Sequence, residues 1–543
     1  MLDLLIQNGL IVDGTGGKPF RGDVAVENGK IVRVAPNISL EAKIVYDAAS
    51  KVVSPGFIDN HSHGDYYCLF GTTGYNLLEQ GITTEIAGNC GGGAIPYYDG
   101  LLDSVRGVAP DEAIEMVKRA TSSFSAFSAT AQKMRMGTNM AVYAPHGNIR
   151  ALVMGYSPEK PTPEQMERMK ALLTEAMESG FVGLSTGLIY PPSVYADTEE
   201  LTELCRVVAA YRGCYASHIR GECDTVVQAV AEAIAIGENS GCDVVISHHK
   251  IGGIANVGLS KETLRLITEA NERGIIRVRA DQYPFLAGQT ALTSALPERF
   301  ATSGVAHMIE RLREPAFRQE VAIAIFASES QSLLKFSGFD GCLILGAPKT
   351  PDAVGKTISQ IAKQRGADET ATVFDLLTEN HGDVDAAYFY QNEQDMLQIL
   401  AAPFVTGGTD SGHNIMQFDR EQQGGAHPRA MSTFPKRLRL VREQNILPLE
   451  EEIRRICYLP AEMCKLDGIG LLLEGYHADI CVFDWEHIRE NNDYHFPFRK
   501  NTGIELVVVN GEIAVRNGDY TGMKAGRLIC KRSQQDSSFT AME

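Results

Sequence analysis

The chain has 543 residues, of which 44% are apolar and 22% are charged, and its formal net charge is −18. This length and composition indicate more than one folded unit and exclude an intrinsically disordered protein. The acidic balance argues against nucleic acid and against an anionic membrane surface as partners.

The amino-terminal residues lack the basic region and long apolar run of a secretion signal. No stretch approaches 18 uninterrupted apolar residues, so we expect no membrane span. The 11 cysteines are scattered without the spacing of a small disulfide-rich domain or a zinc finger. We therefore expect a reducing, cytoplasmic location.

Both ends of the chain have the pattern of short β-strands. The expected strands are 4–6, 10–12, 23–27 and 30–35 at the first end and 479–484, 504–509 and 512–515 at the second. Asn-Gly pairs at 8–9, 28–29 and 510–511 separate apolar runs, and this dipeptide is a strong hairpin signal. We predict one small β domain assembled from residues 1–55 and 467–543.

Between these ends, strand-like runs alternate with helical ones. The expected strands are 53–59, 83–86, 140–143, 182–184, 214–217, 244–247, 275–279 and 404–406. The expected helices include 163–179, 198–212, 224–239 and 261–273, and the first of them begins with a capping box. An alternation of eight strands with helices predicts an α/β fold, a (β/α)8 barrel over residues 56–466.

The interval between the seventh and eighth predicted strands is too long for a simple crossover. It contains helical-looking stretches at 304–313, 357–379 and 392–400. We predict that about 286–346 is an inserted subdomain that covers the barrel mouth as a lid. The insertion leaves from the C-terminal end of a strand, where barrel active sites lie. The alternative is an insertion that only buries one outer face of the barrel.

Residues with metal-binding or acid–base chemistry follow several of the predicted strands. They are His61 and His63, Cys90, His218, His248 with its neighbours His249 and Lys250, and Asp410. Because the carboxyl ends of barrel strands meet at one face, these side chains are expected to converge. Histidine, cysteine and aspartate in one place are typical of a zinc site. Strand alternation allows only one of His248 and His249 to point inward, and the role of His146 is open.

These motifs together resemble the amidohydrolase superfamily, and within it the D-aminoacylase (N-acyl-D-amino-acid deacylase) family. The resemblance covers nearly the whole chain and rests on residues 56–63, 88–91, 185–188, 217–220, 247–250, 281–284, 409–410 and 427–429. It implies that Cys90, His218 and His248 hold one tightly bound zinc ion. It also implies that His61, His63 and Asp410 line a second, weaker metal position.

The resemblance implies zinc-dependent hydrolysis of the amide bond of N-acyl-D-amino acids, releasing a carboxylate and a free D-amino acid. Hydantoinase- and dihydroorotase-like relatives bridge two metals with a carboxylated lysine, and residues 181–205 contain no lysine. The thiol of Cys90 is the available anion instead. Two alternatives stay open: hydrolysis of a cyclic or N-carbamoyl amide, and a barrel that is a catalytically silent scaffold.

The expected mechanism follows from charge. Zinc lowers the pKa of water, and Asp410 accepts the proton and later passes it to the leaving amine. The expected partner is a small molecule with a free carboxylate, which Lys250 and Arg429 are expected to bind while Tyr283 donates a hydrogen bond. The alternative role for both cations is a surface salt bridge.

Overall fold

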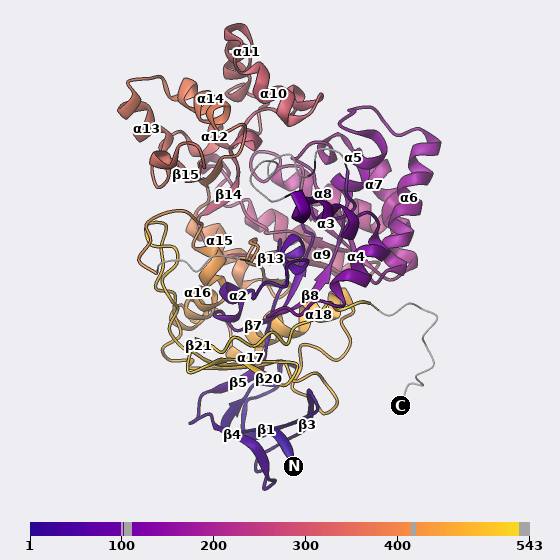
Figure 1. Cartoon of the computed structure of the whole chain (residues 1–543), viewed down its shortest axis with the longest axis vertical. Helices are drawn as coiled ribbons and strands as arrows, with labels where there is room; N and C mark the ends of the chain where they lie inside the picture. The colour runs from indigo at the N-terminus through magenta and orange to yellow at the C-terminus, as the bar shows by residue number, and fades with distance from the viewer. Residues whose placement is uncertain (99–100, 102–110, 414–419, 532–543) are drawn as a thin grey trace.

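The structure is a computed structural model that describes residues 1–98, 101, 111–413 and 420–531. The last twelve residues of the predicted segment 467–543 lie outside that range. Figure 1 shows a β-rich region at the amino-terminal end of the molecule, a mixed α/β body in the middle and a separate helical lobe at the other end. No helix in the described ranges is long and apolar enough to cross a membrane.

A nine-stranded sheet combines both ends of the chain. Its strands are β1 (Leu2–Ile11), β2 (Phe20–Glu27), β3 (Lys30–Ala35), β4 (Ala42–Asp47), β5 (Val52–Pro55), β18 (Ile480–Phe483), β19 (Ile504–Val509), β20 (Glu512–Arg516) and β21 (Asp519–Tyr520). The order is β21-β20-β19-β18-β5-β1-β2-β3, and β4 pairs with β1. The antiparallel pairing of β5 with β18 joins the two ends. Alternating side chains such as Val24, Val26 and Val508 bury one apolar face.

One predicted turn is wrong, because residues 8–9 lie inside the single strand β1. Asn8 has a φ of 59°, and the register with β2 shifts between Ile6 and Gly9. This Asn-Gly pair therefore forms a bulge rather than a hairpin. The pairs at 28–29 and 510–511 do connect neighbouring antiparallel strands.

The predicted strand 53–59 is two strands that belong to different sheets. The first, β5, lies in the nine-stranded sheet, and the second, β6 (Phe57–Asp59), pairs in parallel with β7 (Ile82–Ala87). Gly56 stands between them, and a Cβ atom there would lie 2.1 Å from Thr83 Oγ1. The chain passes from one sheet to the other at this close contact, which only glycine allows.

Eight parallel strand positions close into a barrel. After β6 and β7 they are β8 (Asn139–Val142) with its continuation β9 (Ala144–Pro145), β10 (Gly183–Gly187), β11 (Cys214–His218), β12 (Asp243–Ile246), β13 (Val278–Gln282) and β17 (Val405–Gly407). The strands of each arc pair in parallel. The two arcs are joined by Val182 N, which donates to Val142 O, and by Asn60 N, which donates to Gly407 O. This is the (β/α)8 arrangement.

The seventh strand begins three residues later than predicted. The apolar residues Ile275 and Ile276 suggested an earlier start, but Ile275 is 61% exposed in the turn that follows Gly274. The side chain of Asn271 bonds both the N–H and the C=O of Val278, which fixes where the strand starts. As a result Asp281 lies within β13 and faces the site described below.

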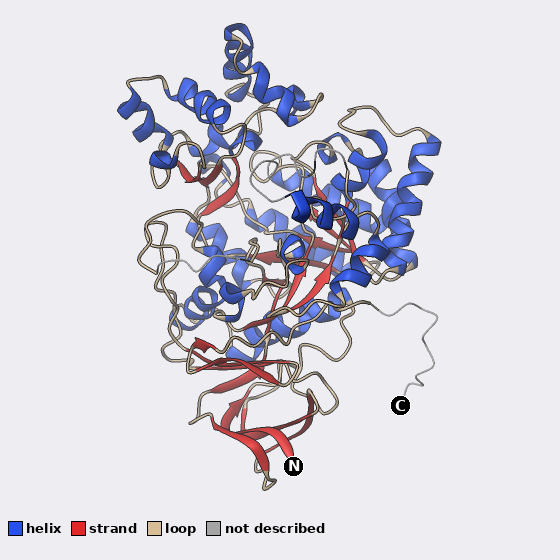
Figure 2. Ribbon diagram, viewed as in Figure 1, coloured by secondary structure: helices blue, strands red, loops and turns tan. Residues whose placement is uncertain are grey.

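Helices cover the outside of the barrel, and Figure 2 shows them around the central strands. Those of the barrel body are α1 (Asp65–Cys68), α2 (Tyr75–Leu78), α3 (Asp111–Ala120), α4 (Phe124–Ala131), α5 (His146–Met154), α6 (Pro163–Glu178), α7 (Thr198–Ala210), α8 (Val226–Ser240), α9 (Ser260–Arg273), α15 (Glu393–Ala401), α16 (Arg429–Glu443), α17 (Leu449–Ile453) and α18 (Leu459–Cys464). The predicted capping box at Thr162 and Gln165 is present at the start of α6. One large apolar cluster fills the space between these helices and the strands.

A separate lobe lies between β13 and α15. Its elements are β14 (Ala287–Ala291), α10 (Val305–Arg311), α11 (Pro315–Ile325), α12 (Leu333–Ser337), β15 (Cys342–Gly346), α13 (Ile358–Arg365), α14 (Glu369–Glu379) and β16 (Asp385–Phe389). The strand β16 pairs with both β14 and β15. The compact unit therefore continues past the predicted range 286–346 to residue 389, because its central strand is the last one in sequence. It has its own apolar core.

Candidate metal centre and active site

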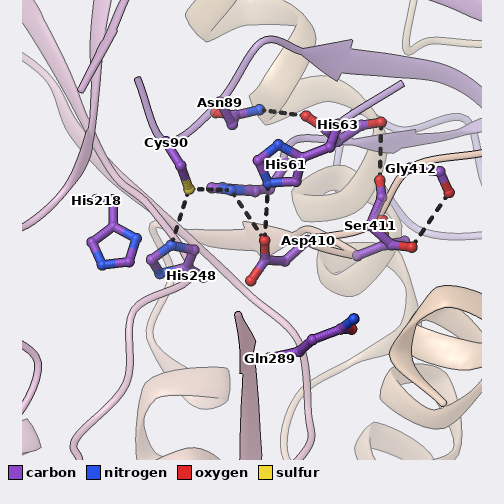
Figure 3. Close-up of polar contacts among 12 residues, drawn as sticks. His61, His63, Asn89, Cys90, His218, His248, Gln289, Asp410, Ser411 and Gly412 are labelled. Carbon is purple, nitrogen blue, oxygen red and sulfur yellow. Dashed lines mark hydrogen bonds and ion pairs between the residues drawn. The ribbon is translucent and has the colours of Figure 1, made fainter. Parts of the chain in front are cut away.

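Six of the residues singled out from the sequence meet at the carboxyl ends of the barrel strands, as Figure 3 shows. They are His61, His63, Cys90, His218, His248 and Asp410. Cys90 Sγ lies 3.2 Å from His61 Nε2 and 3.4 Å from His248 Nε2. His63 Nε2 lies 3.2 Å from Asp410 Oδ1. The ligating atoms form two overlapping groups, His61–His63–Cys90–Asp410 and Cys90–His218–His248, each within 4.8 Å.

The backbone holds three of these residues in the left-handed region. Cys90, His248 and Asp410 have φ values of 54°, 35° and 50°. Residues other than glycine rarely adopt this conformation, and such positions gather at functional sites. Each of the three residues comes two or three positions after the end of a barrel strand. The left-handed conformation there turns the side chain toward the centre of the barrel mouth.

Buried carboxylates hold two of the loops in place. Asp281 accepts a hydrogen bond from the backbone N–H of His248 at 2.8 Å and lies 3.3 Å from His61 Nδ1. This contact leaves His61 Nε2 facing Cys90. Asp59 accepts hydrogen bonds from the N–H and hydroxyl of Thr409, which positions the adjacent Asp410.

A second buried carboxylate lies behind the cluster. Glu222 Oε1 is 2.5 Å from Lys250 Nζ and 3.0 Å from His248 Nδ1, and its Oε2 accepts a hydrogen bond from Tyr390. Burial opposes the charge on Glu222, but Lys250 and the nearby imidazoles outweigh it and hold the Glu222 pKa well below its ordinary value. In turn Glu222 outweighs burial at Lys250 and raises the Lys250 pKa. Lys250 is therefore a buried cation and not a surface group.

Asp410 is an ionised carboxylate inside the mouth. Burial opposes its charge, but Arg429 and His248 outweigh that effect and hold the pKa of Asp410 well below its ordinary value. Arg429 Nη1 lies 2.9 Å from Asp410 Oδ2. The Arg429 guanidinium also lies over the ring of Tyr283, 4.7 Å from its centroid. The arrangement places a proton acceptor next to the candidate metal ligands.

Two observations fit a metal ion at this place. Both ring nitrogens of His218 are buried without a hydrogen-bond partner, and such atoms are costly unless a ligand satisfies them. Burial raises the pKa of the Cys90 thiol well above its ordinary value, so its thiolate needs a nearby cation. Thiolate, imidazole and carboxylate together are the donor set of zinc.

Two other histidines lie away from the cluster. His249 turns toward α9, where its Nε2 is 2.8 Å from Thr263 Oγ1. His146 is buried between Ser193 Oγ at 2.8 Å and Glu200 Oε1 at 2.9 Å. Both are engaged in packing networks outside the metal-type group.

The cluster opens into a cavity of about 510 Å³. Its wall includes Lys250, Tyr283 and Arg429, together with Tyr190, Gln289, Thr290 and Asp385. Strand β14 of the separate lobe forms part of this wall, and its Thr290 hydroxyl lies 3.1 Å from the hydroxyl of Tyr190. The lobe therefore contributes directly to the space beside the candidate site.

Sequence reasoning did not assign Glu222, Asp281 or Asp385 to this site. Glu222 follows His218 by four residues, and an acidic residue so close to a candidate ligand was an available signal. Asp281 was part of a quoted motif, but the misplaced start of β13 hid its direction. Asp385 belongs to the last strand of the lobe, beyond the predicted insertion, and no local pattern marks it.

Comparisons with known proteins show what the whole chain is similar to. Residues 52–314 match the amidohydrolase family model. The D-aminoacylase of Alcaligenes xylosoxydans xylosoxydans is 31% identical over 97% of this chain and 98% of its own length. The N-acyl-D-aspartate deacylase of the same organism is 31% identical over 96% and 93%. The crystal structure of N-acyl-D-glutamate deacylase from Bordetella bronchiseptica, complexed with zinc and a phosphonate mimic of the tetrahedral intermediate, aligns with a TM-score of 0.80 at 30% identity, covering 97% and 99%.

Proposed function

Because the chain belongs to the D-aminoacylase family of amidohydrolases, we propose that it hydrolyses the amide bond of N-acyl-D-amino acids with the help of zinc. The products are a carboxylate and a free D-amino acid. The observation that carries the proposal is the meeting of Cys90, His218 and His248 beside the ionised Asp410. The zinc bound by the Bordetella relative supports the choice of metal.

Cys90, His218 and His248 would hold the tight zinc ion, and His61, His63 and Asp410 a second, weaker one. When bound, zinc supplies Lewis acidity, which acidifies water and polarises a carbonyl group. Two observations support this assignment: the ring nitrogens of His218 have no hydrogen-bond partner, and the pKa of the Cys90 thiol is raised. The carboxylate of Asp281 keeps the His61 ring turned toward the same point.

Asp410 is the proton carrier of the reaction. Its carboxylate is ionised because Arg429 and His248 stabilise the charge, so it accepts a proton from the attacking water. It then delivers that proton to the nitrogen of the leaving amine. The loop around Asp59 and Thr409 keeps the carboxylate at the required place throughout.

Arg429, Lys250 and Tyr283 bind the free carboxylate of the substrate. All three line the cavity, and both cations lie near the ring of Tyr283. Each cation already has one acidic partner, Asp410 for Arg429 and Glu222 for Lys250. The substrate carboxylate therefore joins a balanced charge network and does not meet an isolated cation.

Two finer features belong to the same proposal. Residues 287–389 act as a lid, which is supported by the hydrogen bonds from His427 to Ala287 O and from Arg429 to Gln289 O. The strands from both chain ends form a small β domain that supports the barrel. All eleven cysteines are free, which supports a reducing, cytoplasmic location.

The test is a substrate panel combined with metal analysis. The purified protein is expected to contain at least one zinc per chain and to release D-amino acids from N-acetyl-D-amino acids. N-acetyl-L-amino acids, N-carbamoyl-D-amino acids and cyclic hydantoins serve as matched controls, and we expect slower turnover of each. Absence of zinc, or faster turnover of the cyclic or carbamoyl substrates, would contradict the proposal.

A further inference from the structure

Asp385 is a carboxylate in the cavity wall that the proposed mechanism does not use. It lies at the start of β16 and is exposed to the cavity. No hydrogen bond or ion pair joins its side chain to another residue of the described ranges. Enclosure by the cavity wall raises the pKa of this solvent-accessible carboxyl group, Asp383 adds to the effect, and Arg429 opposes it. A further cation beside Asp385 would favour its ionised form.

The charges of the cavity wall leave Asp385 unmatched. Apart from imidazoles, the charged side chains among the described lining residues are Glu222, Lys250, Asp385, Asp410 and Arg429. Glu222 pairs with Lys250 at 2.5 Å, and Asp410 pairs with Arg429 at 2.9 Å. Apart from the proposed zinc and its ligands, Asp385 is the charged side chain of this described wall without an ion-pair partner, which favours a ligand that brings a positive charge to the lobe side of the wall.

The position of Asp385 is fixed by the pairing of β14 with β16. Asp385 lies opposite Ala291, so the two side chains share one face of the hairpin. Gln289 shares that face by alternation, and all three residues line the cavity. The backbone oxygen of Gln289 accepts a hydrogen bond from Arg429, the proposed carboxylate-binding residue. Asp385 therefore belongs to the same wall as that residue, on a hydrogen-bonded strand and not on a free loop.

We propose that Asp385 selects N-acyl-D-amino acids whose side chain carries a positive charge, such as D-lysine, D-ornithine or D-arginine. This inference rests on the proposed function and specifies its substrate class. The α-carboxylate binds to Arg429 and Lys250, and the cationic end of the side chain pairs with Asp385. An acidic side chain at the same place meets a like charge and is disfavoured.

The test compares N-acetyl-D-lysine with N-acetyl-D-norleucine, which has the same linear chain without the ammonium group. We expect kcat/KM to be about tenfold or more higher for the lysine substrate, the usual effect of a charge-assisted hydrogen bond. Asp385→Asn is expected to lower the lysine-to-norleucine ratio by a similar factor. Asp385→Lys is expected to invert the ratio and to raise turnover of N-acetyl-D-glutamate relative to norleucine.

Asp383→Asn is the matched control, because Asp383 is an exposed carboxylate two residues away that does not line the cavity. Its lysine-to-norleucine ratio is expected to equal that of the unaltered protein. Equal kcat/KM values of the unaltered protein for N-acetyl-D-lysine and N-acetyl-D-norleucine would overturn the inference. An equal loss on both substrates in Asp385→Asn would overturn it as well, since that result indicates a structural role.

A binding measurement separates this inference from the proposed function. Calorimetry on the zinc-loaded unaltered protein compares the products D-lysine and D-norleucine, which undergo no reaction. If no N-acyl-D-amino acid is hydrolysed, the proposed function fails. Tighter binding of D-lysine that Asp385→Asn abolishes would still support the cation site. Equal Kd values for the two products would overturn the cation site whether or not the substrates react.

Discussion

Asp23 in the nine-stranded sheet and His218 at the barrel mouth differ in the hydrogen bonds that their buried polar atoms make. In the sheet, the carboxylate of Asp23 accepts hydrogen bonds from the backbone N–H groups of Asn8 and Ile38. At the mouth, both ring nitrogens of His218 have no hydrogen-bond partner, and three ligand-type residues adopt left-handed backbone. The unsatisfied nitrogens of His218 lie among other ligand-type side chains, and this combination indicates a ligand.

The strongest test of this contrast is Cys90→Ala. We expect the tight zinc to be lost and kcat/KM to fall about a thousandfold or more, because the ion supplies several kcal/mol of transition-state stabilisation. Zinc content and turnover of an N-acetyl-D-amino acid measure the effect. The control is Cys481→Ala, a fully buried thiol in β18 away from the cluster, which is expected to retain both. Full activity in Cys90→Ala would remove Cys90 from the metal site.

The next effect concerns proton transfer. In Asp410→Asn the amide cannot accept the proton, so kcat is expected to fall about a hundredfold to ten-thousandfold. Zinc at the tight position is expected to remain, because its three ligands are unchanged. The exposed Asp352→Asn is the matched control. Unchanged kcat in Asp410→Asn would show that another group carries the proton.

Glu222→Gln tests the support behind the metal ligands. The change leaves the Lys250 cation uncompensated beside His248, so zinc affinity is expected to fall about tenfold to a hundredfold. Competition with a chelator measures the zinc Kd directly. The control is Glu232→Gln, whose carboxylate pairs with Arg220 outside the cluster. An unchanged zinc Kd in Glu222→Gln would limit Glu222 to packing.

The sheet is expected to respond to mutation in stability and not in chemistry. Ile480→Ala opens a cavity in the fully buried face and is expected to lower the free energy of unfolding by about 2–5 kcal/mol. Ile44→Ala, on the 40% exposed β4 position, is expected to cost about 0.5 kcal/mol or less. Denaturant unfolding measures both. A loss of zinc in folded Ile480→Ala would contradict the expectation that the sheet affects stability alone.

A pH dependence of stability is expected at Asp479, where β18 meets the barrel. Burial raises the pKa of Asp479 to about 6 from 3.8, although Asn510 and Asn139 donate hydrogen bonds to it. A raised pKa means that the folded protein binds the proton more tightly, so stability falls as the pH rises from about 4 to about 6. The expected loss is about 2–3 kcal/mol. Relative to Asp479→Asn, the unaltered protein should lose this amount between those pH values, and parallel pH profiles would contradict the shift.

Much of the fold was predictable, because periodicity and turn signals are local. Thr162 and Gln165 marked the start of α6 correctly, and the alternation of strands and helices gave the barrel. The hairpin turn predicted at Asn8-Gly9 was wrong, because the left-handed conformation that this pair favours occurs in bulges as well as in hairpin turns. The end of the inserted lobe was missed because β16 pairs with strands that lie far earlier in the chain.

The sequence allowed prediction of those site residues that lie at the ends of predicted strands. His218 is the last residue of its strand, and His61, His63, Cys90 and Asp410 come two to four residues after theirs, so barrel topology brings them to one rim. The carboxylates that support or complement them come from two strands (Asp59 in β6 and Asp281 in β13), from a loop (Glu222) and from the lobe (Asp385). Their proximity depends on tertiary packing, and no spacing in the sequence encodes it.

The junction at Gly56 has a mechanical consequence. The strand that ends in the two-ended sheet and the strand that leads to His61 are separated by this single residue, and its N–H is bonded to Asp479 O. The connection between the nine-stranded sheet and His61, five residues further on, is therefore short and fixed in position. Inserting two or three residues at Gly56 would separate the position of His61 from that of the sheet. The terminal strands therefore fix the position of the candidate metal ligands.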